Sequence, residues 1–478
     1  MKILLLILFL ISNPINSRIE PPEPPSDDHH GSDVPPSPPG SDGPGPDGGY
    51  DYSNYKATKM NEDLTDENVA CTESDASVVY INDTDTIHIT NSIITKEAGK
   101  ASDREESEFY GVNAAILVQG GKLEMNGGTI NTKVETANAL VATNDGEVTI
   151  TGTNIISTGT SAARGLHATY GGRITASKVT ISSEGGSCAN LATDRGKGVV
   201  SCTECTLSTK GAGSPLIYST GDITVDKTEG TATGAQNVVV EGKNKVTIKN
   251  SSNLKCTAAP NRGDIDQCGV MLYQSMSGDA ETGTSYFTCE DSSLEIVSDS
   301  NYYSTAPMFF ITNTNSEISL KNCAFKYGSN VFLNVKGTTE WGDEGKNGGD
   351  VVLKITNQNI EGNFIADSIS TLKIELIKST ITGTINGDNT AKNLEITIDA
   401  ESTITLTGDS YCNKITNELT DGSNLINGTF SWNKEGEPSD ISSEIPSDIP
   451  TDPKSSAKSI FDFSKIVLGL SLLLAIIL

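Results

Sequence analysis

A short pattern returns at a nearly fixed interval through the first half of the chain. Each copy has an apolar strand of small residues, a Gly turn, a second strand and a Thr/Ser/Asn-rich segment that carries an aliphatic residue. The copies begin at Asn113, Ala137, Ala162 and Cys188. The turn glycines are Gly121, Gly146, Gly172, Gly198 and Gly221, and subtraction gives steps of 25, 26, 26 and 23 residues. A period in the twenties indicates a repeat architecture.

The second strand of each copy alternates apolar and polar residues, which is typical of strands and not of helices. The alternating pairs include Val148 and Ile150, Ile174 and Ala176, Ile223 and Val225, and Val246 and Ile248. One coil of this size cannot bury its own apolar face, whereas stacked coils form a continuous core. The sequence therefore predicts an all-β parallel β-helix, with three short strands per coil, rungs of about 25 residues and coils about 4.8 Å apart. The alternative is a β-sandwich, which has no reason to repeat its turn spacing.

Five segments resemble the right-handed parallel β-helix proteins of bacterial cell surfaces, in the style of autotransporter adhesins and of the pectin-lyase-like superfold. They are Tyr110–Asn131, Tyr170–Ser183, Val238–Asn250, Leu272–Thr288 and Phe309–Ile318. The stretch from Tyr273 to Thr284 is the most specific part of a closer likeness to uncharacterised β-helix surface proteins of gut bacteria. The resemblance covers roughly Glu108 to Asp388 and implies a single right-handed solenoid. It supplies no catalytic residue, because the adhesin-like members have none to carry over.

Composition narrows the choice of partners. The formal net charge is −28, which argues against binding to nucleic acid and against electrostatic binding to anionic lipid. Only 5% of the residues are aromatic and 46 are Gly, which suits a thin solenoid core.

Both ends of the chain carry targeting signals. We expect residues 1–17 to be a secretory signal peptide, 18–68 a disordered Pro/Gly/Asp-rich spacer, 69–432 the β-helix and 433–455 an acidic Pro/Ser stalk. Residues 456–478 match a GPI-attachment propeptide, and Ser455 is the expected attachment residue. The alternative is a short membrane anchor at the C-terminus. The expected location is the extracellular face of the plasma membrane.

Secretion makes three Asn-x-Ser/Thr sites available for glycosylation, at Asn82, Asn250 and Asn427. It also favours disulfides among the nine cysteines, although their odd number leaves at least one without a partner in the chain. Cys202 and Cys205 are the first candidate pair. Cys256 and Cys268 are the second, because they bracket a loop that contains the integrin-type tripeptide Arg262–Asp264.

Catalysis is the main rival to an adhesive function, because many parallel β-helices are pectate lyases or polygalacturonases. Such enzymes need clustered carboxylates together with Arg or Lys. Arg164, Arg173 and Arg195 fall in successive rungs near Asp194, and His167 is the only histidine in the regular rungs. The arginines and Asp194 could line one face, but the simpler interpretation is that they are solvent-exposed turn charges.

The sequence thus favours a GPI-anchored, non-enzymatic surface protein that serves adhesion or glycan binding. No catalytic residue, metal or cofactor is expected, and the expected partners are glycans or neighbouring cell-surface molecules. The alternatives are a polysaccharide-degrading enzyme and a structural coat protein without a specific ligand.

Overall fold

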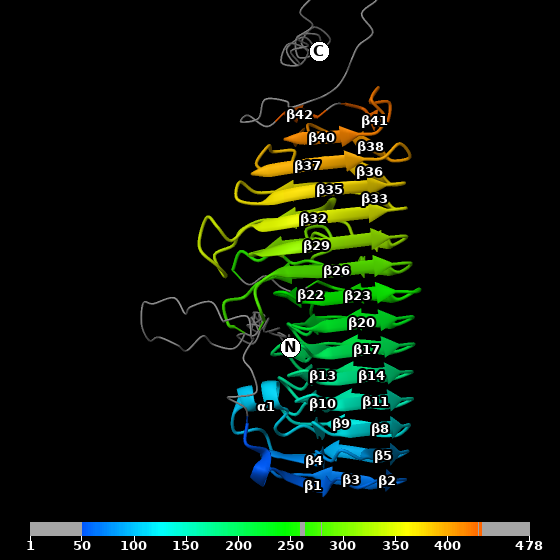
Figure 1. Ribbon diagram of the computed structural model, residues 1–478, viewed down its shortest axis with the longest axis vertical. Helices are drawn as coiled ribbons and strands as arrows, with labels where there is room; N and C mark the ends of the chain where they lie inside the picture. The colour runs from blue at the N-terminus through cyan, green and yellow to red at the C-terminus, as the bar shows by residue number, and fades with distance from the viewer. Residues whose placement is uncertain (1–49, 259–262, 279, 429, 433–478) are drawn as a thin grey trace, which may run out of the picture. The chain divides into compact units, whose positions relative to one another are not determined.

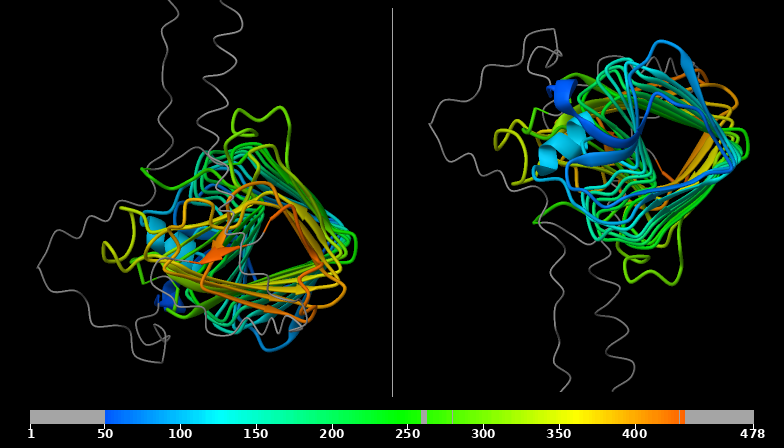
Figure 2. Two further views of the ribbon diagram at one scale, coloured as in Figure 1. Left: turned by 90° about the horizontal axis from the view of Figure 1, so that it is seen from above. Right: turned by 90° about the horizontal axis from the view of Figure 1, so that it is seen from below.

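The computed structural model describes residues 50–258, 263–278, 280–428 and 430–432. Over these residues the chain is a parallel β-helix (Figure 1). Each regular coil contributes one strand to each of three sheets, named A, B and C in chain order. Seen along the stack, the coils superimpose around a common interior (Figure 2).

Sheet A has twelve described strands. They are β1 (Lys56–Met60), β4 (Ala76–Ile81), β7 (Ile116–Gln119), β10 (Leu140–Thr143), β13 (Leu166–Thr169), β16 (Leu191–Asp194), β19 (Ile217–Ser219), β22 (Val238–Glu241), β25 (Val270–Tyr273), β28 (Phe309–Thr312), β31 (Val331–Val335) and β34 (Asn363–Ala366).

Sheet B has fourteen described strands and runs through nearly every coil. They are β2 (Leu64–Thr65), β5 (Thr86–Thr90), β8 (Lys122–Asn126), β11 (Glu147–Thr151), β14 (Arg173–Ser177), β17 (Val199–Thr203), β20 (Asp222–Asp226), β23 (Lys245–Lys249), β26 (Thr284–Glu290), β29 (Thr314–Lys321), β32 (Gly349–Thr356), β35 (Thr371–Ile377), β37 (Asn393–Ile398) and β40 (Lys414–Asn417).

Sheet C has ten strands within the described ranges, and two smaller sheets, E and F, follow it in the last coils. Sheet C comprises β3 (Asn68–Cys71), β6 (Ile93–Lys96), β9 (Thr129–Thr132), β12 (Asn154–Ser157), β15 (Thr180–Ser183), β18 (Thr206–Thr209), β21 (Glu229–Ala232), β24 (Asn253–Cys256), β27 (Ser293–Ile296) and β30 (Ala324–Lys326). Sheet E comprises β33 (Asn359–Glu361), β36 (Thr380–Gly383), β38 (Thr403–Leu406) and β41 (Leu425–Ile426), and sheet F comprises β39 (Tyr411–Cys412) and β42 (Ser431–Trp432).

The predicted alternation of apolar and polar residues along each strand determines which side chains form the core. Val148 of β11 pairs with Leu123 on one side and Ile174 on the other, and all three side chains are almost fully buried. Burying one such side chain contributes about 1.5–3 kcal/mol. The stability of the fold therefore comes from the sum of many such contributions along the columns that run from coil to coil.

The repeated glycines mark close approaches between coils. A Cβ on Gly146 would lie 2.3 Å from the carbonyl oxygen of Val118, and one on Gly172 would lie 2.0 Å from that of Ala142. The turn that leads into sheet B therefore has no room for a side chain at these positions, which explains why glycine recurs there.

The expected start of the solenoid differs from the structure. The first coil begins with β1 at Lys56, preceded by a 3-10 helix, η2 (Tyr52–Asn54), and not at residue 69. The sequence suggests a spacer here because Lys56–Met60 is mostly polar, whereas in the structure this strand is ordered by pairing with β4 and not by its own burial. The last described strand ends at Trp432.

A stretch rich in charged residues before Gly111 forms helix α1 (Arg104–Tyr110). The Asp103 side chain caps its first turn by accepting from the backbone N–H of Glu105 at 2.8 Å, and Gly111 ends it with a φ of 74°. No helix among the described residues is long and apolar enough to cross a membrane.

Candidate functional site on the outer face of sheet A

Sheet A is largely buried on both faces from β4 to β28. Its inward side chains join the main core, whereas Leu117 and Val141 point outward and form a separate cluster with Tyr55 and Tyr80. Further along the same outward column, Val239, Met271 and Phe310 form another cluster, with Ile265 and Cys268. Helix α1 and the loop at 337–349 lie on the same side of the stack (Figures 1 and 2).

A group of charged side chains lies buried between α1 and sheet A. Arg164 Nη2 is 3.4 Å from Asp194 Oδ2 and 3.9 Å from Glu108 Oε2. Arg104 Nε donates to Glu108 Oε1 at 2.7 Å, and His167 Nε2 is 3.7 Å from Asp194 Oδ2. The side chains of Glu108, Arg164, Asp194 and His167 are each no more than 10% exposed.

For the two carboxyl groups of this cluster, burial and pairing with arginine shift the pKa in opposite directions. Burial raises the pKa of Asp194 to about 6, against the pull of Arg164. Burial also acts to raise the pKa of Glu108, but Arg164 and Arg104 outweigh it, so that pKa lies below its usual value. Burial and then Arg164 hold the pKa of His167 well below 6.5. His167 is therefore neutral near pH 7, and neither of its ring nitrogens has a hydrogen-bond partner within the described residues.

The structure corrects the interpretation of these residues as exposed turn charges. Arg164 and Asp194 are buried, and the Arg195 guanidinium lies over the Phe109 ring of α1 at 3.7 Å. Arg173 does not join them, because it lies exposed on sheet B in register with Glu147 and Val199. The three arginines do not line one face, and Arg164 and Asp194 are each less than 10% exposed.

A second buried carboxylate, which the sequence interpretation did not single out, lies further along sheet A. Glu241, at the end of β22, is 1% exposed. Its Oε2 accepts from the hydroxyls of Tyr218 at 2.5 Å and Tyr273 at 2.6 Å, and Ser275 donates to Oε1. The available signal was an acidic residue closing a strand, Val238–Glu241, that is otherwise apolar on both faces.

Two loops near this carboxylate are joined by a hydrogen bond and an ion pair. The first connects β24 to β25, and the second connects β31 to β32. The Asp264 carboxylate accepts from the Thr339 backbone N–H at 3.0 Å, and Lys336 Nζ is 2.8 Å from Asp266 Oδ1. The carboxylate of Asp264 in the integrin-type tripeptide is therefore already hydrogen-bonded within the protein. Arg262 of the same tripeptide lies outside the described residues. On the second loop, the Asn347 side-chain amide donates to the Trp341 carbonyl at 2.6 Å. The Trp341 ring packs on Tyr273, with centroids 4.5 Å apart.

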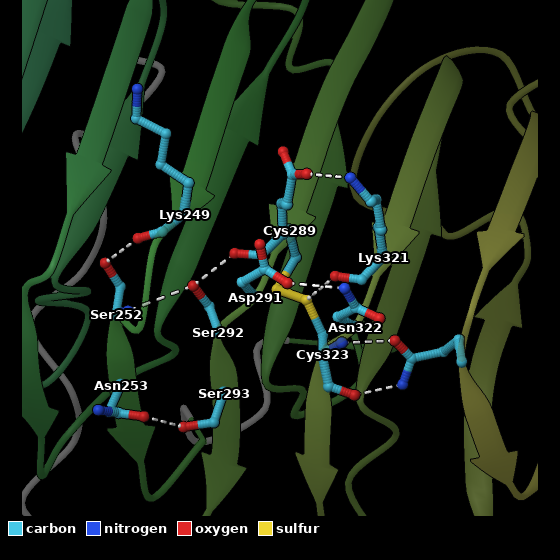
Figure 3. Close-up of a disulfide and its surroundings, with 12 residues drawn as sticks. Lys249, Ser252, Asn253, Cys289, Asp291, Ser292, Ser293, Lys321, Asn322 and Cys323 are labelled. Carbon is cyan, nitrogen blue, oxygen red and sulfur yellow. Dashed lines mark hydrogen bonds and ion pairs between the residues drawn. A yellow bond between two sulfur atoms is a disulfide. The ribbon is translucent and has the colours of Figure 1, made fainter.

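The cysteines follow one expectation and contradict another. Cys202 and Cys205 form a disulfide, as expected, and a second joins Cys289 of β26 to Cys323 in the next coil (Figure 3). Cys256 and Cys268 are both buried free thiols. Their expected bond is absent because Cys256 packs in the main core, whereas Cys268 belongs to the cluster on the outer face of sheet A.

The structure places the three glycosylation candidates on the surface. Asn82, Asn250 and Asn427 are all exposed, and Asn250 lies in the turn after β23 with a φ of 56°. Asn427 lines an open depression of about 480 Å³ beside β38 and β42. Ser455, the expected signal peptide, and the expected spacers up to residue 49 and from residue 433 lie outside the described residues.

Within the described ranges, no three His, Cys, Asp or Glu side chains are grouped to hold a metal ion. Comparison of the chain with family models, with curated proteins and with solved structures found no match. The parallel β-helix is therefore assigned from the strand pairing of this chain itself.

Proposed function

We propose that this chain is a GPI-anchored, non-enzymatic surface protein of the adhesin-like β-helix type, which binds glycans or neighbouring cell-surface molecules. The observation that carries the proposal is a column of hydroxyl side chains on the outer face of sheet B. It runs through seven consecutive strands, from β11 to β29, as Thr149, Thr175, Ser201, Thr224, Thr247, Thr288 and Ser319. We call it the hydroxyl column.

The hydroxyl column suits contact with a repeating polymer. All seven side chains are exposed or half-buried. Strand pairing fixes their spacing at roughly 4.8 Å, and each hydroxyl both donates and accepts hydrogen bonds. A rigid row of such groups loses little conformational entropy when a ligand binds, which favours recognition without any chemical step.

The buried charges support binding over catalysis. A lyase or glycosidase needs its carboxylates and cations within reach of the polymer. Arg164 and Asp194 lie beneath α1, and the carboxylate of Glu241 is held by three hydroxyl groups. A structural coat protein without a specific ligand is the remaining alternative.

A glycan array tests the proposal and separates these alternatives. The full-length protein is expected to bind a defined set of glycans and to leave them intact. A protein with no hits would be assigned to the coat class. Release of unsaturated uronides from pectin, abolished by Asp194→Asn or Arg195→Ala, would instead establish the enzyme.

The lipid anchor at Ser455 is tested on intact cells. Phosphatidylinositol-specific phospholipase is expected to release the protein, whereas Ser455→Pro, combined with Ser456→Pro to block the neighbouring site, should prevent anchoring. Retention of the wild-type protein on cells from which the same enzyme frees a known GPI-anchored protein would contradict the proposal.

A further inference from the structure

Three aromatic side chains lie together on the outer face of sheet A, and we call them the aromatic patch: Tyr218, Tyr273 and Trp341. Each is only partly buried and packs against the cluster that contains Val239 and Met271. Aromatic residues make up only 5% of the chain, so three partly exposed rings at one place are a local concentration.

The rings are held in fixed orientations. The hydroxyls of Tyr218 and Tyr273 share one oxygen of Glu241, so this buried carboxylate of β22 joins β19 and β25, the strands on either side of it. The Trp341 backbone is fixed by Asn347, and its ring contacts Tyr273 at an angle of 40°. Rings fixed in this way lose little side-chain entropy on binding a ligand.

We propose that the aromatic patch binds the pyranose rings of an uncharged glycan. The inference rests on the proposed glycan-binding function and adds to the hydroxyl column a second binding site, on sheet A, with its own ligand class. The C–H faces of a sugar are apolar and its rim carries hydroxyls, so it matches aromatic rings that have polar groups at their edges. The Tyr218 and Tyr273 hydroxyls, with Ser275 beside them, provide those polar groups.

The negative charge around the aromatic patch favours an uncharged ligand. The carboxylate of Glu241 lies directly behind the tyrosine hydroxyls, and Lys336 on the neighbouring loop is paired with Asp266. The chain as a whole has 62 acidic and 34 basic residues. A uronate or sialylated glycan would meet a repulsive field at this surface.

Intrinsic fluorescence measures this binding directly. The chain has two tryptophans, so full-length Trp432→Phe protein reports on Trp341 alone. The probes are uncharged hexaoses of glucose, mannose and N-acetylglucosamine, with pentagalacturonate as the acidic comparison. At least one uncharged hexaose is expected to change the Trp341 emission saturably, whereas pentagalacturonate should not.

A pair of substitutions in the wild-type chain locates the site. Trp341→Ala is expected to weaken binding of the responding hexaose at least tenfold, measured by affinity electrophoresis on folded protein. Tyr286→Ala is the matched control, because Tyr286 is an aromatic residue 40% exposed on sheet B, and it should bind as the wild type does.

The possible outcomes distinguish a failure of the proposed site from a failure of the proposed function. Unchanged binding in Trp341→Ala, or no Trp341 emission change while a hexaose binds, would overturn the site and leave the proposed function standing. Selective binding of pentagalacturonate would overturn the ligand class. If no glycan binds the wild-type protein, both proposals fall.

Discussion

At the scale of single residues, the main feature of the protein is charge buried where the sequence suggested exposed turns. Arg164 lies between Glu108 and Asp194, and both carboxylates are less than 10% exposed. Removing a charge from water costs several kcal/mol, so each member of such a group depends on the others. The cluster fastens α1 to the coils that carry Arg164 and Asp194.

Replacing Arg164 tests that dependence. Arg164→Ala would leave two buried carboxylates without their shared cation, and we expect a loss of about 3–5 kcal/mol in the free energy of unfolding. The matched control is Arg173→Ala on the exposed face of sheet B, which should cost less than about 1 kcal/mol. Denaturant unfolding of both variants measures the difference, and equal losses would contradict the buried cluster.

The pKa of Asp194 predicts a pH dependence. Because the folded pKa of about 6 lies above the usual 3.8, the folded state binds this proton more tightly than the unfolded state. The ionised form therefore costs stability above pH 6, and that cost, on the order of 3 kcal/mol, is relieved as the pH falls from 7 towards 4.

The Asp194→Asn variant cannot take up that proton. The melting temperature of the wild type minus that of Asp194→Asn should therefore become more positive as the pH falls through 6. The control is Asp222→Asn, whose side chain is 45% exposed. A pH dependence of the melting difference for Asp194→Asn that is no larger than that for Asp222→Asn would refute the assignment.

At the scale of elements, the turns between sheets B and C are fixed by particular backbone conformations, by hydrogen bonds and by a disulfide. Residues with positive φ recur there, including Asn91, Lys178, Glu204 and Asn250. In the turns that follow β23 and β26, side-chain hydroxyls pair with backbone, as when Ser252 N–H donates to Ser292 Oγ at 3.2 Å (Figure 3). The Cys289–Cys323 disulfide joins two coils at this corner.

The two disulfides should contribute unequally to stability. Cys289 and Cys323 are 34 positions apart and Cys202 and Cys205 only 3, so the first bond closes the longer loop in the unfolded chain. Loop-closure entropy predicts losses of about 4 kcal/mol for Cys289→Ala/Cys323→Ala and about 2 kcal/mol for Cys202→Ala/Cys205→Ala. Denaturant unfolding compares the two double variants, and a larger loss for the second would contradict this ranking.

The strands and their register could be predicted from the sequence, whereas the helix that covers sheet A could not. Val148, Ile174 and Val200 lie in one column because their two-residue alternation and the coil period together specify the register. Helix α1 was missed because its seven residues are too few for a hydrophobic period, although Asp103 and Gly111 are recognisable caps.

The candidate site could not be predicted because it depends on long-range packing. Nothing near Arg164 in the sequence indicates that α1 will cover it. Likewise, Trp341 meets Tyr273 only because a long loop returns to the coil that contains β25. By contrast, the Cys202–Cys205 bond was predictable, since short spacing alone brings the two sulfurs together.

At the scale of the whole molecule, the described coils form a one-dimensional array in which each coil contacts its neighbours. Such an array keeps faces of different chemistry apart: the hydroxyl column follows sheet B, and the buried charges and the aromatic patch follow sheet A. One surface can therefore be changed without disturbing the other, which makes the proposed binding surfaces separable by mutation.

Binding without turnover is the central functional claim, and calorimetric titration of the full-length protein with uncharged hexaoses tests it most directly. Mass analysis of the sugar recovered from the same cell completes the measurement. We expect saturable binding, weakened by Trp341→Ala, and recovery of the hexaose at its full length. Shortened or unsaturated sugar, or no heat of binding with any glycan, would contradict the account.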